Sequence, residues 1–188
     1  EDKRVKELFT FAIERRLPFL LTNTGKVCVA QDISNVALAC AYVGYRGNMA
    51  PFISAVASRC GGQKGGIMAD AKPQEGGNLI YACGKLVDLA GGKVSVLGKD
   101  VGVIVGESAA AMRKAASPGA PIQPKAQELS NMLWGLAHFD WYDAGVISVL
   151  AGVFVRGIKS STSQNVANVL LALAKLSWYE EGVVSELA

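Results

Sequence analysis

Amide side chains recur at two fixed positions in four segments of the sequence, and amides are side chains that can hydrogen-bond to the edges of unpaired bases. The four pairs are Gln31 and Asn35, Gln74 and Asn78, Gln127 and Asn131, and Gln164 and Asn168. Counted from each Asn, position three is Leu38, Tyr81, Trp134 or Leu171, and position seven is Tyr42, Lys85, His138 or Lys175. Positions minus four, zero, three and seven share one face of a helix. That face offers amides, flat rings and cations, the groups that helical-repeat proteins present to single-stranded RNA.

The same residues also have a structural interpretation. Asn and Gln that recur in every repeat can cap or bridge successive helices, and Trp134 and Tyr81 can pack between repeats. Position seven is variable and mostly polar or basic, so nucleic-acid contact and solvated surface both stay open there. His138 is the only histidine, and its counterparts in the other repeats share no chemistry with it. We therefore expect neither catalysis nor metal ligation at His138.

The pattern of apolar residues predicts the helices that carry these side chains. In each segment, apolar residues fall at positions minus two, one, two, five and eight, which is the 3.6-residue rhythm of one buried stripe. Positions four and six are always Ala or Gly, as in Gly135 and Ala137. Small residues there let a neighbouring helix come close. The pattern predicts stacked helices.

A second apolar segment follows each of these helices, at residues 49–60, about 101–112 and 146–155, and a further one begins at residue 182. Val5, Leu8 and Ile13 have helical spacing and indicate the second helix of an earlier unit. The expected fold is all-α: one domain over residues 1–188, an α-solenoid of about four stacked antiparallel helix pairs, truncated at both ends. Its repeats start near residues 31, 74, 127 and 164, after a partial unit at 1–16.

Gly-, Pro- and Lys-rich stretches predict the connecting loops, at residues 17–30, 61–72, 88–96 and 116–126. Gly76 and Gly77 fall inside the first helix of the second repeat. Because each Gly costs a helix about 1 kcal/mol, we expect them to delay the start of that helix.

Composition excludes several classes of protein. Hydrophobic residues make up 51% of the chain and charged residues 19%, with a net charge of +3, which fits neither a disordered tail nor a small DNA-coating protein. Basic residues exceed acidic ones before residue 126 and are outnumbered after it. Arg46, Arg113 and Lys114 belong to the basic part and are candidate phosphate contacts, with solvated surface as the alternative.

No enzyme, cofactor or metal signature is recognisable. The four cysteines lack Cys-x-x-Cys pairs, and Cys40 and Cys83 occupy the place of Leu136 and Leu173 in the apolar stripe, so we expect them in the core. The longest apolar run, at residues 146–155, is too short to cross a bilayer, which needs about 20 residues. The sequence predicts a non-enzymatic protein without a membrane span, in a reducing compartment.

One repeat pattern resembles a known family. The run Gln-x-x-[Ser/Ala]-Asn-x-Leu-[Trp/Leu]-[Gly/Ala]-Leu-Ala-x-[Phe/Leu], followed by Trp-Tyr and a second helix, is similar to the octotricopeptide repeats of organellar RNA-binding proteins, which are related to the repeats of RAP-domain proteins. The resemblance is close over residues 127–188, moderate over 31–60 and weak over 74–112. Only one interval here, of 37 residues, approaches the family's spacing.

The resemblance implies a solenoid that binds RNA in an organelle, a mitochondrion in preference to a chloroplast. It implies single-stranded RNA or rRNA segments as ligands, and relatives also serve as accessory proteins of organellar ribosomes. The leading hypothesis is therefore an organellar RNA-binding protein, plausibly a ribosomal accessory component. The alternative is an α-solenoid scaffold that binds ribosomal or other assembly proteins. Both hypotheses predict an all-helical chain.

Overall fold

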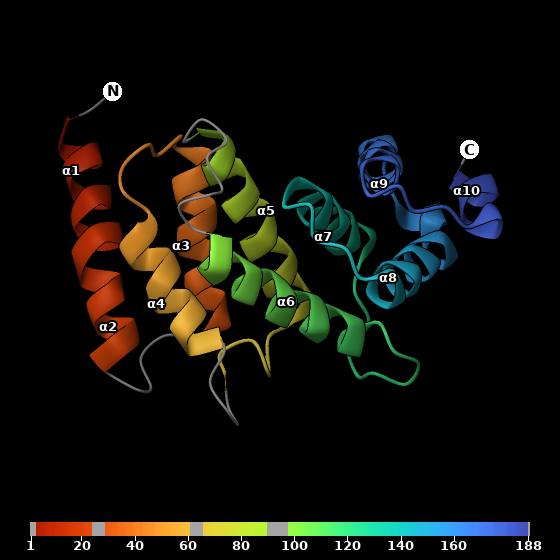
Figure 1. Cartoon of the computed structure of the whole chain (residues 1–188), viewed down its shortest axis with the longest axis horizontal. Helices are drawn as coiled ribbons and strands as arrows, with labels where there is room; N and C mark the ends of the chain where they lie inside the picture. Colours follow the sequence, from red (N-terminus) through yellow and green to blue (C-terminus); the bar gives the residue numbers. More distant parts are fainter. Residues whose placement is uncertain (1–2, 24–28, 61–65, 90–97, 188) are drawn as a thin grey trace.

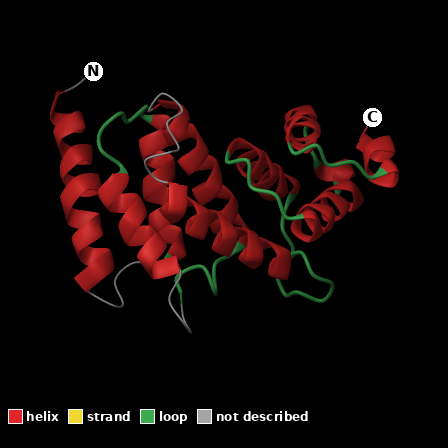
Figure 2. Cartoon of the chain, viewed as in Figure 1, coloured by secondary structure: helices red, strands yellow, loops and turns green. Residues whose placement is uncertain are grey.

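The computed structural model describes residues 3–23, 29–60, 66–89 and 98–187, and within these ranges all regular structure is helical (Figure 2). The α-helices are α1 Lys3–Phe11, α2 Leu17–Asn23, α3 Ala30–Tyr42, α4 Ala50–Cys60, α5 Pro73–Leu89, α6 Gly98–Ala115, α7 Ala126–His138, α8 Ala144–Arg156, α9 Ser163–Lys175 and α10 Glu181–Leu187. A π-helix, Ala12–Arg16, joins α1 to α2, and a short 3-10 helix, Ile158–Ser160, precedes α9.

The helices form two layers that run along the molecule (Figure 1). In the first, which we call the A layer, α3, α5, α7 and α9 pack against one another in succession. In the second, the B layer, the same is true of α2, α4, α6, α8 and α10. Each A-layer helix is followed in the chain by a B-layer helix, so the predicted solenoid of helix pairs is confirmed. The N-terminal helix packs on α4, as expected for the second helix of a preceding unit.

Two of the local predictions are wrong. Residues 17–23 were expected in a loop, but they form α2, which buries Leu21. Pro18 lacks the N–H that an α-helix needs, and the wider π turn directly before it accommodates the ring without ending the helix. Residues 88 and 89 were also expected in a loop, but they belong to α5, which extends to Leu89. Residues 24–28, 61–65 and 90–97 of the expected loops lie outside the described residues.

The two glycines of α5 do not delay the helix. Pro73 stands in the first turn, where its missing N–H costs nothing, and the backbone N–H of Lys72 donates to Glu75 Oε2 over 2.9 Å. A Cβ atom at Gly77 would lie 2.9 Å from the carbonyl oxygen of Glu128. Gly77 therefore brings α5 and α7 into backbone contact, and this packing offsets its low helix propensity.

All four A-layer helices begin with the same cap. The residue after each recurring Gln accepts a hydrogen bond from the backbone N–H three residues earlier, which satisfies one of the free donors of the first turn. These bonds run from Val29 to Asp32 (3.1 Å), Lys72 to Glu75 (2.9 Å), Lys125 to Glu128 (2.8 Å) and Thr162 to Asn165 (3.1 Å).

Three A-layer helices also end alike. The second residue after the end of α3, α7 and α9 has a positive φ. These residues are Gly44 (66°), Asp140 (52°) and Ser177 (51°). The N–H of the next residue then bonds back to the helix, from Tyr45 to Cys40, Trp141 to Leu136, and Trp178 to Leu173. This is a Schellman motif, and it sets an aromatic ring at position ten of three repeats.

The core lies between and within the layers, and it contains the cysteines expected there. Cys40 is 0% exposed and Cys83 is 2% exposed. Cys60, at the end of α4, is also buried, whereas Cys28 lies outside the described residues. Burial raises the pKa of Cys40 to about 11 and the pKa values of Cys60 and Cys83 to about 12. In the described part of the chain, no helix combines the length and apolar character that crossing a membrane requires.

Candidate nucleic-acid interface

The four position-seven side chains form a row across the A layer. Tyr42, Lys85, His138 and Lys175 each stand in the last turn, or the second half, of α3, α5, α7 and α9, and these helices pack in this order. Tyr42 is 77% exposed and Lys175 is exposed, whereas Lys85 is half-buried and the His138 side chain is only 14% exposed. The structure thus brings all four predicted position-seven residues to one side of the solenoid. We call them the A-layer row.

The middle of this row rests on a cluster of aromatic rings. Tyr81 and Trp134, at position three of α5 and α7, lie with ring centroids 5.2 Å apart. His138 stacks on Trp134 at 5.0 Å with an interplanar angle of 17°. The ammonium of Lys85 lies 5.0 Å from the centre of the Trp134 ring and 5.6 Å from that of Tyr81. The rings therefore pack between repeats, as the structural interpretation of Tyr81 and Trp134 predicted, and they hold the Lys85 cation by cation–π attraction.

His138 is placed to act as a neutral ring. Its Nε2 atom lies 3.6 Å from Oδ1 of Asp88 on α5. Burial lowers the pKa of His138 below its ordinary value; the carboxylate of Asp88 acts in the opposite direction, and the ammonium groups of Lys175 and Lys85 reinforce the lowering. No cluster of three or more potential metal ligands occurs among the described residues. The ring serves as a packed, hydrogen-bonding surface beside two cations.

The recurring amides of the third repeat are structural. Gln127 Nε2 donates to Asn131 Oδ1 over 2.7 Å, and Gln127 Oε1 accepts from Asn165 Nδ2 over 2.9 Å. Asn131 and Asn165 are both buried, at 8% and 3% exposure. This chain of hydrogen bonds links α7 to α9, so Gln127 bridges successive repeats and Asn131 faces it rather than a ligand.

The other predicted amides are more accessible. Asn35 is exposed on α3, and Asn78 and Asn168 are partly exposed on α5 and α9. They stand two helical turns before the A-layer row, on the same helix face. Asn35, Asn78 and Asn168 are therefore placed where a ligand lying along the row can be reached.

Arg46, Arg113 and Lys114 do not join the row. Arg46 is exposed in the connection between α3 and α4, directly after Tyr45. Arg113 and Lys114 are exposed in the last turn of α6, in the B layer. The predicted cations are thus divided between two parts of the surface, because spacing along one helix contains no information about which layer another helix joins.

Sequence reasoning missed Asp88 and two sets of recurring residues. Asp88, which faces His138, lies at position ten of a repeat whose helix runs on past the usual end. The capping residue at minus three had a visible signal, since an acidic or amide residue follows every recurring Gln. Position ten also had a signal in the sequence, because Tyr45, Trp141 and Trp178 are all aromatic and each stands ten residues after the recurring Asn.

Comparison of the chain with protein-family models, with curated proteins and with solved structures finds no match.

Proposed function

We propose that this chain is a non-enzymatic RNA-binding helical-repeat protein that holds single-stranded RNA, or a single-stranded segment of rRNA, across the A layer. The observation that carries the proposal is the A-layer row, in which four adjacent helices each contribute one ring or cation at the same position. Packed helices lie about 8–10 Å apart. Helical repeats that bind RNA place about one base on each repeat, and the row supplies one contact per repeat.

The members of the row have different roles in this proposal. Tyr42 offers an exposed ring on which a base can stack, a contact that accepts any base. Lys85 and Lys175 neutralise phosphates, and the attraction of Lys85 to Trp134 fixes its position before RNA arrives. His138, neutral and stacked on Trp134, offers a ring edge rather than a charge. The organellar setting, mitochondrial in preference to chloroplast, and a role beside an organellar ribosome are part of the proposal through the repeat resemblance alone.

The test is a titration of the whole chain with fluorescent single-stranded RNA at several salt concentrations. A double variant, Lys85→Ala with Lys175→Ala, removes two charges from the row; Lys99→Ala with Lys159→Ala removes two exposed charges elsewhere. Each lost phosphate contact lowers the slope of log affinity against log salt by about 0.7. We expect the row variant to lose about twice that slope and the control to keep the slope of the parent chain.

Two results would refute the proposal. The first is absence of RNA binding by the parent chain at low salt. The second is an equal loss in the row variant and the control, which would assign the binding to diffuse charge.

One observation favours the second candidate, a protein scaffold. Leu171 takes position three of α9 and is 50% exposed, where α5 and α7 have the packed Tyr81 and Trp134. An apolar side chain exposed at this position can be buried by a protein partner. Partner complexes that survive nuclease treatment, and that Leu171→Ser disrupts, would support the scaffold over RNA binding.

A further inference from the structure

Three junctions along the solenoid have the same construction but are filled differently. Each junction is the place where two successive B-layer helices meet, and the position-ten ring that follows an A-layer helix lies beside it. In the first junction the hydroxyl of Tyr45 donates to Glu14 Oε1 over 3.0 Å, and the backbone N–H of Asn48 donates to the same oxygen over 3.0 Å. In the third, beside Trp178, Ser148 Oγ donates to Glu180 Oε2 over 3.3 Å. In both of these junctions, a carboxylate of the chain itself accepts a hydrogen bond from a neighbouring side chain.

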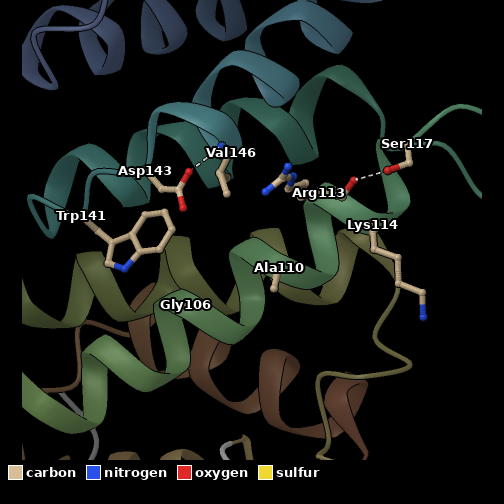
Figure 3. A pocket seen from close by; sticks show the side chains of 8 residues that line it. All are labelled: Gly106, Ala110, Arg113, Lys114, Ser117, Trp141, Asp143 and Val146. Atoms are coloured by element: carbon tan, nitrogen blue, oxygen red, sulfur yellow. Dashed lines mark hydrogen bonds between the residues drawn. The ribbon is translucent and has the colours of Figure 1, made fainter.

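The middle junction contains a pocket of 470 Å³ between α6 and α8 (Figure 3). Gly106 and Ala110 of α6 form its small-residue floor, and Trp141, at position ten, stands beside them. A Cβ atom at Gly106 would have no heavy atom of a neighbour within 4 Å, so the space above this residue is open. Two cations, Arg113 and Lys114, also line the pocket, together with the carboxylate of Asp143.

The charge of this pocket is not balanced within the described residues. Arg113 directs its guanidinium toward the first turn of α8 (Figure 3), where a Cβ atom at Gly145 would lie 3.8 Å from Nη1. Neither Arg113 nor Lys114 forms an ion pair with a residue that the structure describes. The one acidic lining residue, Asp143, already accepts the backbone N–H of Val146 over 2.9 Å and caps α8.

We propose that the pocket binds one nucleotide of a single-stranded RNA, with its phosphate on the guanidinium of Arg113 and its base against Trp141. The planar guanidinium of Arg113 can donate two parallel hydrogen bonds to a phosphate, and indole is a favourable surface for base stacking. An acidic side chain would satisfy the cations but would leave Trp141 and most of the pocket unfilled. The inference rests on the proposed function for RNA as the source of the nucleotide, but the pocket lies in the B layer and uses none of the A-layer row.

The probe is adenosine 5′-monophosphate, and the readout is the NMR signal of the Trp141 indole N–H, assigned with Trp141→Phe. We expect the nucleotide to shift this signal, and adenosine without phosphate to bind about tenfold more weakly or worse, because the charged contacts are lost. Gly106→Leu fills the open space above the floor and should reduce nucleotide affinity by about tenfold or more. Gly102→Leu is the matched control, since Gly102 is exposed on the same helix, its Cβ would also meet nothing within 4 Å, and it does not line the pocket.

Several outcomes decide the inference. It is overturned if adenosine monophosphate leaves the Trp141 signal unchanged, if Gly102→Leu weakens binding as much as Gly106→Leu, or if N-acetylaspartate shifts the signal as strongly as the nucleotide. The last result would indicate an acidic protein segment as the ligand.

Failure of the pocket and failure of the proposed function give different results. RNA binding that needs Lys85 and Lys175, with no nucleotide response at Trp141, refutes the pocket alone. A nucleotide response at Trp141 in a chain that does not bind RNA supports the pocket as a nucleotide site, but it refutes RNA as the source of the nucleotide together with the RNA-binding function.

Discussion

The bridge between α7 and α9 can be tested by replacing Gln127 with Leu. The substitution shortens the side chain by one atom and removes both hydrogen bonds of the amide, the 2.7 Å bond to Asn131 and the 2.9 Å bond from Asn165. Each such bond contributes about 0.5–1.5 kcal/mol, and a buried polar partner left without one costs about 1–3 kcal/mol. Because Asn131 and Asn165 are buried but Gln127 itself is exposed, water can reach part of the network. We therefore expect a loss of about 2 kcal/mol in the free energy of unfolding.

The assay is urea denaturation followed by circular dichroism at 222 nm. Gln164→Leu is the control, because Gln164 has the same position in the next repeat and is exposed on α9; surface substitutions of this kind change stability by about 0.5 kcal/mol or less. Gln127→Glu should fall between the two, since its carboxylate still accepts from Asn165 but places a second acceptor against Asn131. Equal stability of Gln127→Leu and Gln164→Leu would refute the reasoning and would return the recurring Gln to the list of candidate ligand contacts.

Three other predictions concern the frame of the solenoid. Asp140→Gly and Ser177→Gly should each raise the free energy of unfolding by about 0.5–1 kcal/mol, because a left-handed conformation is strained for both residues; a loss measured by denaturation would contradict this. The folded state resists protonation of His138, so below pH 6.5, the ordinary pKa of an unfolded His, the unfolded state binds more protons and stability falls as the pH falls. His138→Gln should flatten that part of the stability profile, and parallel profiles for the two proteins would exclude the effect. In a Cys28→Ser background, the remaining thiols should react with a disulfide reagent at pH 8 only on unfolding, because burial raises their pKa values to about 11 or 12; rapid reaction of the folded chain would show that one of them is accessible.

The sequence predicted the helical frame because the apolar stripe repeats with the period of a helix and buries the same positions in each copy. Cys40 could be placed in the core on this ground alone, since it stands where another repeat has Leu136. Local propensity was a weaker guide. It placed a loop at α2 and a late start at α5, where a π turn before Pro18 and the close approach at Gly77 override it.

The candidate site was only partly predictable. Spacing within one helix identified the face that carries Lys85 and His138, and the structure shows that this face continues from helix to helix. It did not reveal that His138 and Lys85 pack on the ring of Trp134, or that Arg113 belongs to the other layer. Those facts depend on contacts between helices, about which a repeat pattern contains no direct information.

In this solenoid, the residues that recur from repeat to repeat stabilise the fold, and the candidate ligand contacts vary. The features shared by all or most repeats are the cap at minus three, the left-handed helix end and the small residues of the A layer, and each of them stabilises the frame. Gln127 shows that a recurring amide can belong to this set. The residues that differ between repeats include those at position seven and those beside the position-ten rings: Tyr45 donates to Glu14, whereas Trp141 lines a pocket with Arg113. A group common to every repeat cannot distinguish one base from the next. If the chain binds RNA as proposed, any preference among RNA sequences must therefore come from the variable positions, and base selectivity should change with His138 but not with Gln127.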